Sequence, residues 1–75
     1  MMEDRILEIM REVFDVEDID RTVSQKNCEK WDSMAQLNLV VELESEFDTS
    51  FEPEEIGAMT DFTSIYTIVM NHKII

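Results

Sequence analysis

The residue best placed for chemistry is Ser33, in the tripeptide Asp32-Ser33-Met34, at a predicted junction between a loop and a helix. The first turn of a helix leaves side chains and N–H groups facing outward, and its partial positive charge tolerates a phosphate. A serine with no base beside it is inert. Chemistry at Ser33 would therefore have to be carried out by another enzyme, and the simpler interpretation is an ordinary capping serine.

The other reactive side chains do not form a catalytic group. His72 is the one histidine, and we expect it in a frayed, solvated C-terminal tail. Cys28 is the one cysteine, so it cannot form an internal disulfide, and we expect a free thiol. A calcium loop counted from Asp18 needs glycine at its sixth position, where Val23 stands. The chain is therefore expected to be neither an enzyme nor a calcium sensor, and to hold no zinc.

Helical spacing of apolar residues predicts the elements that position Ser33. We expect helices over residues 3–14 and 34–47, a short helix starting at Pro53, and a last helix starting near Phe62. Residues 15–32 lack this period and form a long loop, whose isolated apolar side chains would anchor it to the core: Val16, Ile19, Val23 and Trp31. The 75 residues thus predict one all-α domain, a small bundle of three main helices plus one short helix.

The ends and faces of these helices can also be predicted. Asp32 is a good N-cap for the helix over 34–47, and Ser33 with Gln36 also matches a capping box, so the sequence does not decide between Asp32 and Ser33 as the cap. The last helix would be capped by Thr60 or Asp61. The core-facing arc expected over 34–47 comprises Met34, Leu37, Val40, Val41, Leu43 and Phe47, with Leu39 at its edge. The short helix would turn Ile56 and Met59 inward, and the last helix would bury Phe62, Ile65, Tyr66 and Val69.

Negative charge dominates the chain and narrows the choice of partners. The net charge is −12, and there is no Lys or Arg between Trp31 and His72. Such a chain repels nucleic acid and anionic lipid surfaces and favours basic protein surfaces, although a merely solvated acidic face explains the charge equally well. No apolar run approaches the roughly 20 residues of a membrane span, and no signal peptide is recognisable. We expect a free-standing cytoplasmic monomer.

The segment from Trp31 to Phe47, WDSMAQLNLVVELESEF, resembles the core of an acyl carrier protein. Its continuation is similar as well, through Asp48 to Phe51, Glu54 to Ile56 and Met59 to Phe62. The similarity covers the whole chain, including its length, its acidity, the first helix and the long first loop. The tripeptide around Ser33 is by itself weak evidence for this family. It is fairly specific for the family when it stands at the start of a helix that ends in Glu-Phe-Asp.

The resemblance implies that Ser33 carries a 4′-phosphopantetheine arm, which a phosphopantetheinyl transferase would install from coenzyme A with magnesium. The thiol of the arm would hold an acyl or aminoacyl group as a thioester. The implied partners are this transferase, a loading enzyme, and a downstream transferase or synthase with a basic docking surface. The protein supplies the attachment point, and the cofactor supplies the reactive sulfur.

The resemblance also suggests roles for residues near Ser33. Asp32 would cap the helix and present the serine, and Met34 would contact the transferase or else be a half-buried core residue. Glu42 and Glu46 would meet Arg or Lys of partner enzymes. A space that shelters an acyl chain would be lined by Leu37, Val41, Met59 and Phe62.

Departures from the family pattern point to a specialised biosynthetic pathway. Ala35 and Asn38 are neutral where many fatty-acid carriers have acids, and Trp31 also differs from that subgroup, although an anchoring core role explains Trp31 better. Two alternatives stay open. One is an unmodified acidic helical module for protein interaction, and the other is a binder of divalent cations.

Overall fold

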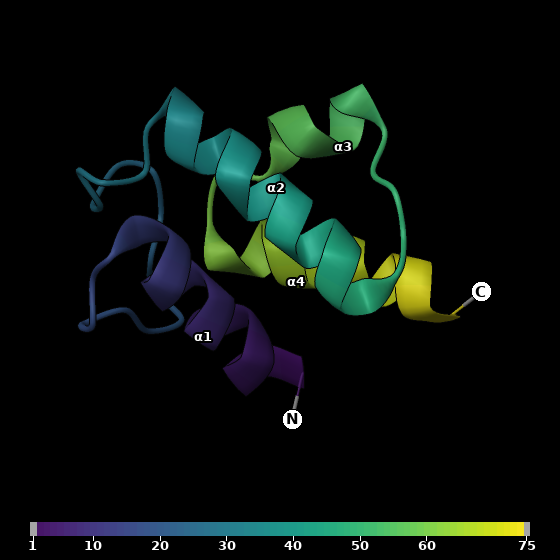
Figure 1. Cartoon of the computed structure of the whole chain (residues 1–75), viewed down its shortest axis with the longest axis horizontal. Helices are drawn as coiled ribbons and strands as arrows, with labels where there is room; N and C mark the ends of the chain where they lie inside the picture. Colours follow the sequence, from purple (N-terminus) through teal and green to yellow (C-terminus); the bar gives the residue numbers. More distant parts are fainter. Residues whose placement is uncertain (1, 75) are drawn as a thin grey trace.

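The computed structural model describes residues 2–74 and confirms the predicted small all-α bundle. Its helices are α1 (Met2–Phe14), α2 (Ser33–Phe47), the short α3 (Pro53–Ala58) and α4 (Phe62–Ile74). In Figure 1, α2 crosses in front of α4, while α1 and α3 lie on opposite sides of α2. Within the described residues, no helix combines the length and the apolar character that crossing a bilayer requires.

Apolar side chains from α1, α2, α4 and the connecting segments form one shared core. The short helix α3 has no buried residue of its own, although Met59, directly after it, is completely buried. The largest fully buried side chains are Ile6, Met10, Leu39, Leu43, Met59, Ile65 and Val69. As predicted, Phe62, Ile65 and Val69 form the buried side of α4, with Tyr66 half-buried beside them.

The residues that follow α1 and α2 are both aspartates in the left-handed backbone conformation. Asp15, after α1, has φ of 55°, and Asp48, after α2, has φ of 51°. Asp and Asn adopt this conformation more readily than other side chains, and the single glycine of the chain lies elsewhere, at Gly57. The N–H of Asp48 donates to the carbonyl of Glu44, so the turn also closes the end of α2.

The long loop between α1 and α2 is anchored as the sequence predicts. Ile19, Val23 and Trp31 are buried and Val16 is half-buried. The ring of Trp31 packs on Phe14 of α1 with 5.1 Å between ring centroids. These contacts hold the loop against α1 up to the residue before Asp32.

The middle of the loop also pairs with the segment between α3 and α4. Ser24 and Asp61 form an isolated antiparallel bridge. The N–H of Gln25 donates to the carbonyl of Thr60 at 2.9 Å, and the N–H of Phe62 donates to the carbonyl of Val23 at 3.0 Å. Because its backbone groups are paired in this way, the loop has a defined path without regular secondary structure.

The cap of α4 is Asp61, one of the two predicted candidates. Its carboxylate accepts a hydrogen bond from the N–H of Ser64 at 2.8 Å. The Ser64 hydroxyl lies within hydrogen-bond distance of the Asp61 N–H, at 3.3 Å. This reciprocal arrangement satisfies two of the backbone donors that a helix N-terminus leaves free.

The predicted core-facing arc of α2 is partly wrong. Leu39 was expected at its edge, but it is completely buried, and Ala35 and Leu43 lie on the same buried row. Met34, Leu37 and Val41 were expected in the core, but they are 69%, 60% and 59% exposed. Apolar residues occur almost all round α2, so helical spacing alone does not decide which side packs.

The two leucines of α2 offer a matched test of this orientation. We expect Leu39→Ala to lower the free energy of unfolding by about 2–5 kcal/mol, because it leaves a cavity in the core. Leu37→Ala removes the same atoms from an exposed position and should change that free energy by less than about 0.5 kcal/mol. Urea denaturation followed by circular dichroism measures both. Equal losses would contradict this orientation of α2.

Gly57 in α3 offers a second test, because nothing in the structure requires a glycine there. Its φ is negative, and a Cβ built on it has no atom within 4 Å. Gly57→Ala should raise the free energy of unfolding by about 0.4–1 kcal/mol, because alanine loses less backbone entropy on folding. Thermal denaturation of the two proteins checks this, and a lower melting temperature for the alanine variant would contradict it.

Candidate functional site

Ser33 is the first residue of α2, and its side chain is exposed. The cap is Asp32, whose carboxylate accepts a hydrogen bond from the N–H of Ala35 at 2.9 Å. This decides between the two candidate caps and leaves the Ser33 hydroxyl with no hydrogen-bond partner among residues 2–74. The hydroxyl therefore stands at the positive end of the α2 dipole, at the rim of a shallow depression that also includes Trp31 and Leu37.

Gln36 does not complete the predicted capping box, and its side chain has a different role. Its Oε1 accepts a hydrogen bond from the indole N–H of Trp31 at 2.6 Å. Its Nε2 donates to the carbonyls of Ile56 at 2.9 Å and Met59 at 3.3 Å. Sequence reasoning missed this cluster. The available signal was an amide in the first turn of the predicted helix and an indole five residues before it, two groups that need partners when they are buried.

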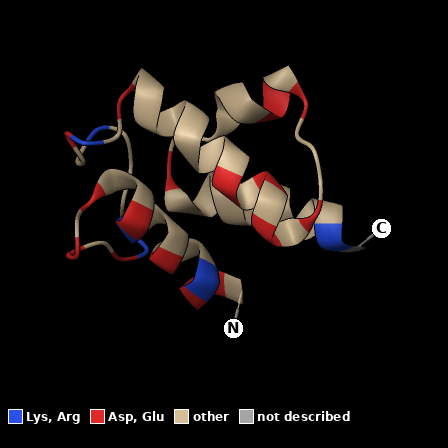
Figure 2. Ribbon diagram, viewed as in Figure 1, with Lys and Arg blue, Asp and Glu red and all other residues tan. Residues whose placement is uncertain are grey.

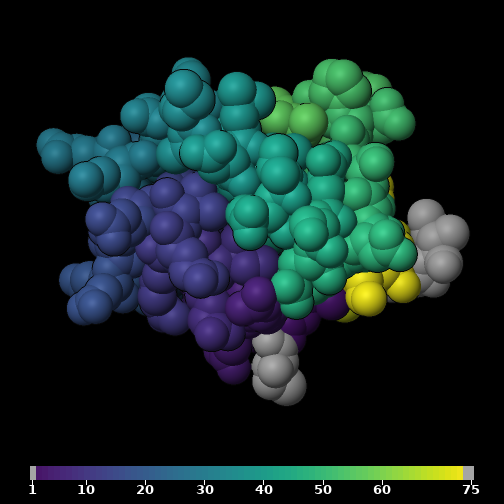
Figure 3. Space-filling view, viewed as in Figure 1, coloured from purple at the N-terminus to yellow at the C-terminus, as the bar shows by residue number. Residues whose placement is uncertain are grey.

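The three exposed apolar residues of α2 form one stripe that begins beside Ser33. Met34, Leu37 and Val41 have the spacing of residues on one helix face. In the space-filling view of Figure 3, α2 (teal) occupies the middle of the face turned toward the reader. A stripe of this kind on a chain of this size is typical of a surface that contacts another protein. We call it the apolar stripe of α2.

The structure does not bring together the four residues expected around a sheltered acyl chain. Met59 and Phe62 are buried in the core, at 0% and 4% exposure, whereas Leu37 and Val41 lie on the outer side of α2. The expectation that all four line one space between helices is therefore wrong for Leu37 and Val41. The reason is the orientation of α2, which turns the Leu39 row inward.

Of the two expected docking carboxylates, Glu46 forms an ion pair, and Glu42 has no partner within residues 2–74. Glu42 is exposed and lies at the rim of a depression with Val13 of α1 and Val41. Glu46 instead accepts a hydrogen bond from Arg5 of α1 at 2.8 Å, and this bond lowers the pKa of Glu46 below its ordinary value. A basic partner at Glu46 would have to compete with Arg5.

The charge around Ser33 is divided between two sides. Figure 2 shows acidic residues but no Lys or Arg on α2 and α3, whereas Lys26 and Lys30 lie in the loop that precedes Ser33. Neither lysine forms an ion pair within residues 2–74. A partner would therefore meet negative charge along α2 and charges of both signs on the loop, where Glu29 lies between the two lysines in sequence.

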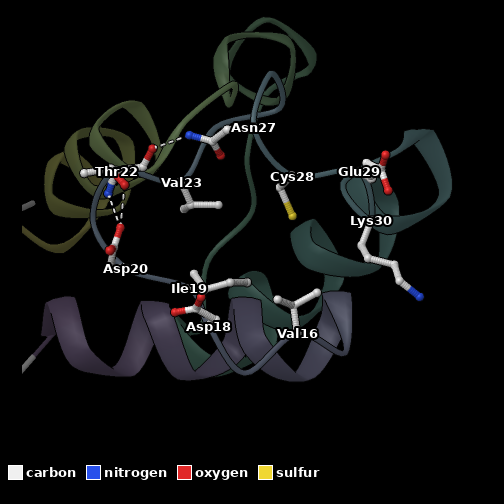
Figure 4. A pocket seen from close by; sticks show the side chains of 10 residues that line it. All are labelled: Val16, Asp18, Ile19, Asp20, Thr22, Val23, Asn27, Cys28, Glu29 and Lys30. Atoms are coloured by element: carbon white, nitrogen blue, oxygen red, sulfur yellow. Dashed lines mark hydrogen bonds between the residues drawn. The ribbon is translucent and has the colours of Figure 1, made fainter.

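A hollow under the loop contains several of the residues tested above as a calcium loop. Figure 4 shows Asp20 turned toward Thr22, whose N–H it accepts at 2.9 Å, while Glu29 lies on the far side of the hollow beside Lys30. Cys28 is half-buried here as a free thiol. In the part of the chain that the structure describes, no three His, Cys, Asp or Glu residues are grouped so as to hold a metal ion.

The expectation of a frayed, solvated His72 is wrong. Its Nδ1 lies 2.8 Å from the hydroxyl of Thr49, and its Nε2 lies 2.9 Å from the carboxylate of Glu55. The edge of the ring packs against Phe51, with 4.9 Å between centroids. Tertiary contacts thus order the last turns of α4, and the histidine joins α4 to α3 and to the segment between α2 and α3.

Comparisons of the chain with protein-family models, with curated proteins and with solved structures found no match. The arrangement around Ser33 is therefore interpreted from its own geometry and from the resemblance described above.

The ionised state of Glu55 generates a pH prediction. The hydrogen bond from the Glu52 N–H, and after it the one from His72, lowers the pKa of Glu55 below 4.5. A carboxyl whose pKa is lower in the folded state stabilises the protein above its ordinary pKa, and this stabilisation is lost as the pH falls through the folded value. Glu55→Gln should therefore be less stable than the original protein near neutral pH, and the difference should shrink below about pH 4.5.

Urea denaturation at a series of pH values measures this difference. The matched control is Glu54→Gln, at the preceding residue of the same short helix. The carboxylate of Glu54 is exposed and forms no hydrogen bond or ion pair within residues 2–74. A difference between Glu55→Gln and the original protein that stays constant down to about pH 3 would contradict the assignment.

Proposed function

We propose that this protein is a carrier that holds acyl or aminoacyl groups on a 4′-phosphopantetheine arm attached to Ser33. It is a substrate of a phosphopantetheinyl transferase and has no catalytic role of its own. The observation that carries the proposal is the position of the Ser33 hydroxyl at the start of α2, directly after the Asp32 cap. The side chain is exposed, and its hydroxyl has no hydrogen-bond partner within residues 2–74. The resemblance of residues 31–47 to acyl carrier proteins favours an attachment site over an ordinary serine in the first turn of a helix.

The residues around Ser33 fit a phosphodiester. The hydroxyl is open to a second protein, and the N-terminal end of α2 places partial positive charge near a phosphate. Asp32 is engaged by the Ala35 N–H, which holds the serine at the tip of the helix. In the transfer, the Ser33 oxygen forms a bond to phosphorus of coenzyme A, the phosphoanhydride bond breaks, and adenosine 3′,5′-bisphosphate leaves. The hydroxyl proton goes to a base of the transferase.

When bound, the arm supplies a thiol that carries the acyl or aminoacyl group as a thioester. This chain provides the surface that partner enzymes recognise. The apolar stripe of α2 begins at Met34, next to Ser33, and Glu42 lies alongside it. A partner with apolar side chains and Arg or Lys residues fits this surface, and the charges would steer its approach.

We infer that the partners are the transferase, a loading enzyme, and a downstream transferase or synthase of a specialised pathway. The neutral residues Ala35 and Asn38 near the serine favour a dedicated pathway over general fatty-acid synthesis. A lone cysteine without a disulfide partner is compatible with the reducing cytoplasm as the proposed compartment.

The proposal is tested by incubating the purified protein with a phosphopantetheinyl transferase, coenzyme A and magnesium. Intact-mass spectrometry should detect the addition of one arm, and peptide mapping should locate it on Ser33. Ser33→Ala should gain no mass, because it lacks the oxygen that forms the bond. The matched control is Ser45→Ala, which removes another exposed serine of the same helix and should be modified like the original protein.

Two outcomes would contradict the proposal. Modification of Ser33→Ala would move the attachment site elsewhere. Failure of the original protein with several transferases of broad substrate range would favour the alternative, an unmodified acidic interaction module that uses the same surface of α2.

A further inference from the structure

Three segments that are distant in sequence meet at the side chain of Gln36, one helical turn after Ser33. The loop contributes the indole N–H of Trp31, at 2.6 Å from Oε1. The end of α3 contributes the carbonyls of Ile56 and Met59, at 2.9 Å and 3.3 Å from Nε2. Both hydrogens of the amide and one acceptor site of its oxygen are thus in use, and the side chain is half-buried.

Each partner of Gln36 has few alternatives. Trp31 is 4% exposed, and its indole nitrogen can only donate, so its hydrogen bond would be lost in the core without Gln36. At the end of α3, the Ile56 carbonyl also accepts the N–H of Met59, so the Met59 carbonyl depends on Gln36 more than the Ile56 carbonyl does. Because α3 buries none of its own residues, this amide and the His72–Glu55 pair are its main polar attachments.

The placement of Gln36 makes these bonds relevant to Ser33. The two residues are three positions apart in α2, so they share the first turn of the helix. Asp32 fixes that turn from the N-terminal side through the Ala35 N–H. Gln36 attaches the same turn to the buried side of the molecule, because its side chain accepts a hydrogen bond from Trp31. The ring of Trp31 in turn packs on Phe14 of α1.

We propose that Gln36 is a positioning residue for Ser33. Its amide holds the first turn of α2 in one orientation relative to Trp31 and to the end of α3, so that an enzyme meets the Ser33 hydroxyl already ordered. The inference rests on the proposed function, because it concerns how readily Ser33 is modified. In this role Gln36 acts through the first turn of α2, because its amide is already hydrogen-bonded to Trp31, Ile56 and Met59.

Loss of the Gln36 amide should weaken binding of the transferase to this protein and should leave the bond-forming step unchanged. Without the amide, the first turn of α2 has more conformations, and the transferase must order it on binding. We expect Gln36→Met, which keeps the length of the side chain but loses its hydrogen bonds, to raise the KM of the transferase for this protein roughly tenfold. The kcat should stay within about twofold, since the ordered complex is the same once it has formed.

A partial variant and a coupling test separate the two sides of the amide. Gln36→Glu keeps an acceptor for Trp31 and loses the donors to Ile56 and Met59, so its KM should lie between those of the original protein and Gln36→Met. Trp31→Phe keeps an aromatic ring on Phe14 but loses the N–H. Alone it should raise the KM, but combined with Gln36→Met it should add little, because the hydrogen bond is already gone.

The control for a merely structural effect is Ile6→Val, a core variant in α1 that lowers stability away from the site. It should leave the KM unchanged. A KM for Gln36→Met equal to that of the original protein, or a rise in KM as large in Ile6→Val, would overturn the inference while leaving the carrier function intact.

A measurement on the unmodified protein keeps the inference testable if Ser33 proves not to be a substrate. Amide hydrogen exchange by NMR should show lost protection at Met59, at Ala35 and at position 36 in the Gln36→Met variant, with Ile6→Val as the control. Loss at both places supports the ordering of the first turn of α2 by Gln36 even where the carrier function fails. Unchanged exchange at the first turn of α2 overturns it in either case.

Discussion

The packing of one row of α2 determines how the rest of the molecule is arranged. Ala35, Leu39 and Leu43 turn into the core that α2 shares with α1 and α4. Because side chains are fixed at about 100° intervals around a helix, this choice also directs the other residues of α2. It brings the Gln36 amide to the end of α3 and leaves Ser33 and the apolar stripe of α2 outside. Rotating α2 by half a turn would remove both features at once.

Local patterns in the sequence predicted the helices, although the caps of α2 and α4 each stayed open between two neighbouring residues. Helix α1 has one apolar side and an acidic first turn, so its extent and its core-facing side follow from the spacing of its apolar residues. Asp32 and Pro53 mark helix starts by capping and by ring geometry. The exposed position of Ser33 also follows from a local rule, because the first turn of a helix faces outward.

The parts that could not be predicted depend on contacts between distant residues. The buried face of α2 was misassigned because apolar residues surround the helix, and only the positions of α1 and α4 select one side. Gln36 and His72 find partners 20 and 17 residues away, in Ile56 and Glu55, and no local rule gives such pairs. The Arg5–Glu46 ion pair, between the start of α1 and the end of α2, is a contact of the same kind.

The contacts of His72 have a consequence for any shortening of the chain. The ring lies close to the C-terminal end of α4, yet it bonds Thr49 and Glu55 and packs on Phe51. Deleting residues 72–75 would therefore remove a hydrogen-bond partner from the Thr49 hydroxyl and from the Glu55 carboxylate, and it would open a gap beside the ring of Phe51 between α2 and α3. The C-terminus is thus a poor position for truncation, and a purification tag is better fused at the opposite end of the polypeptide, where the side chain of Met2 is only partly buried.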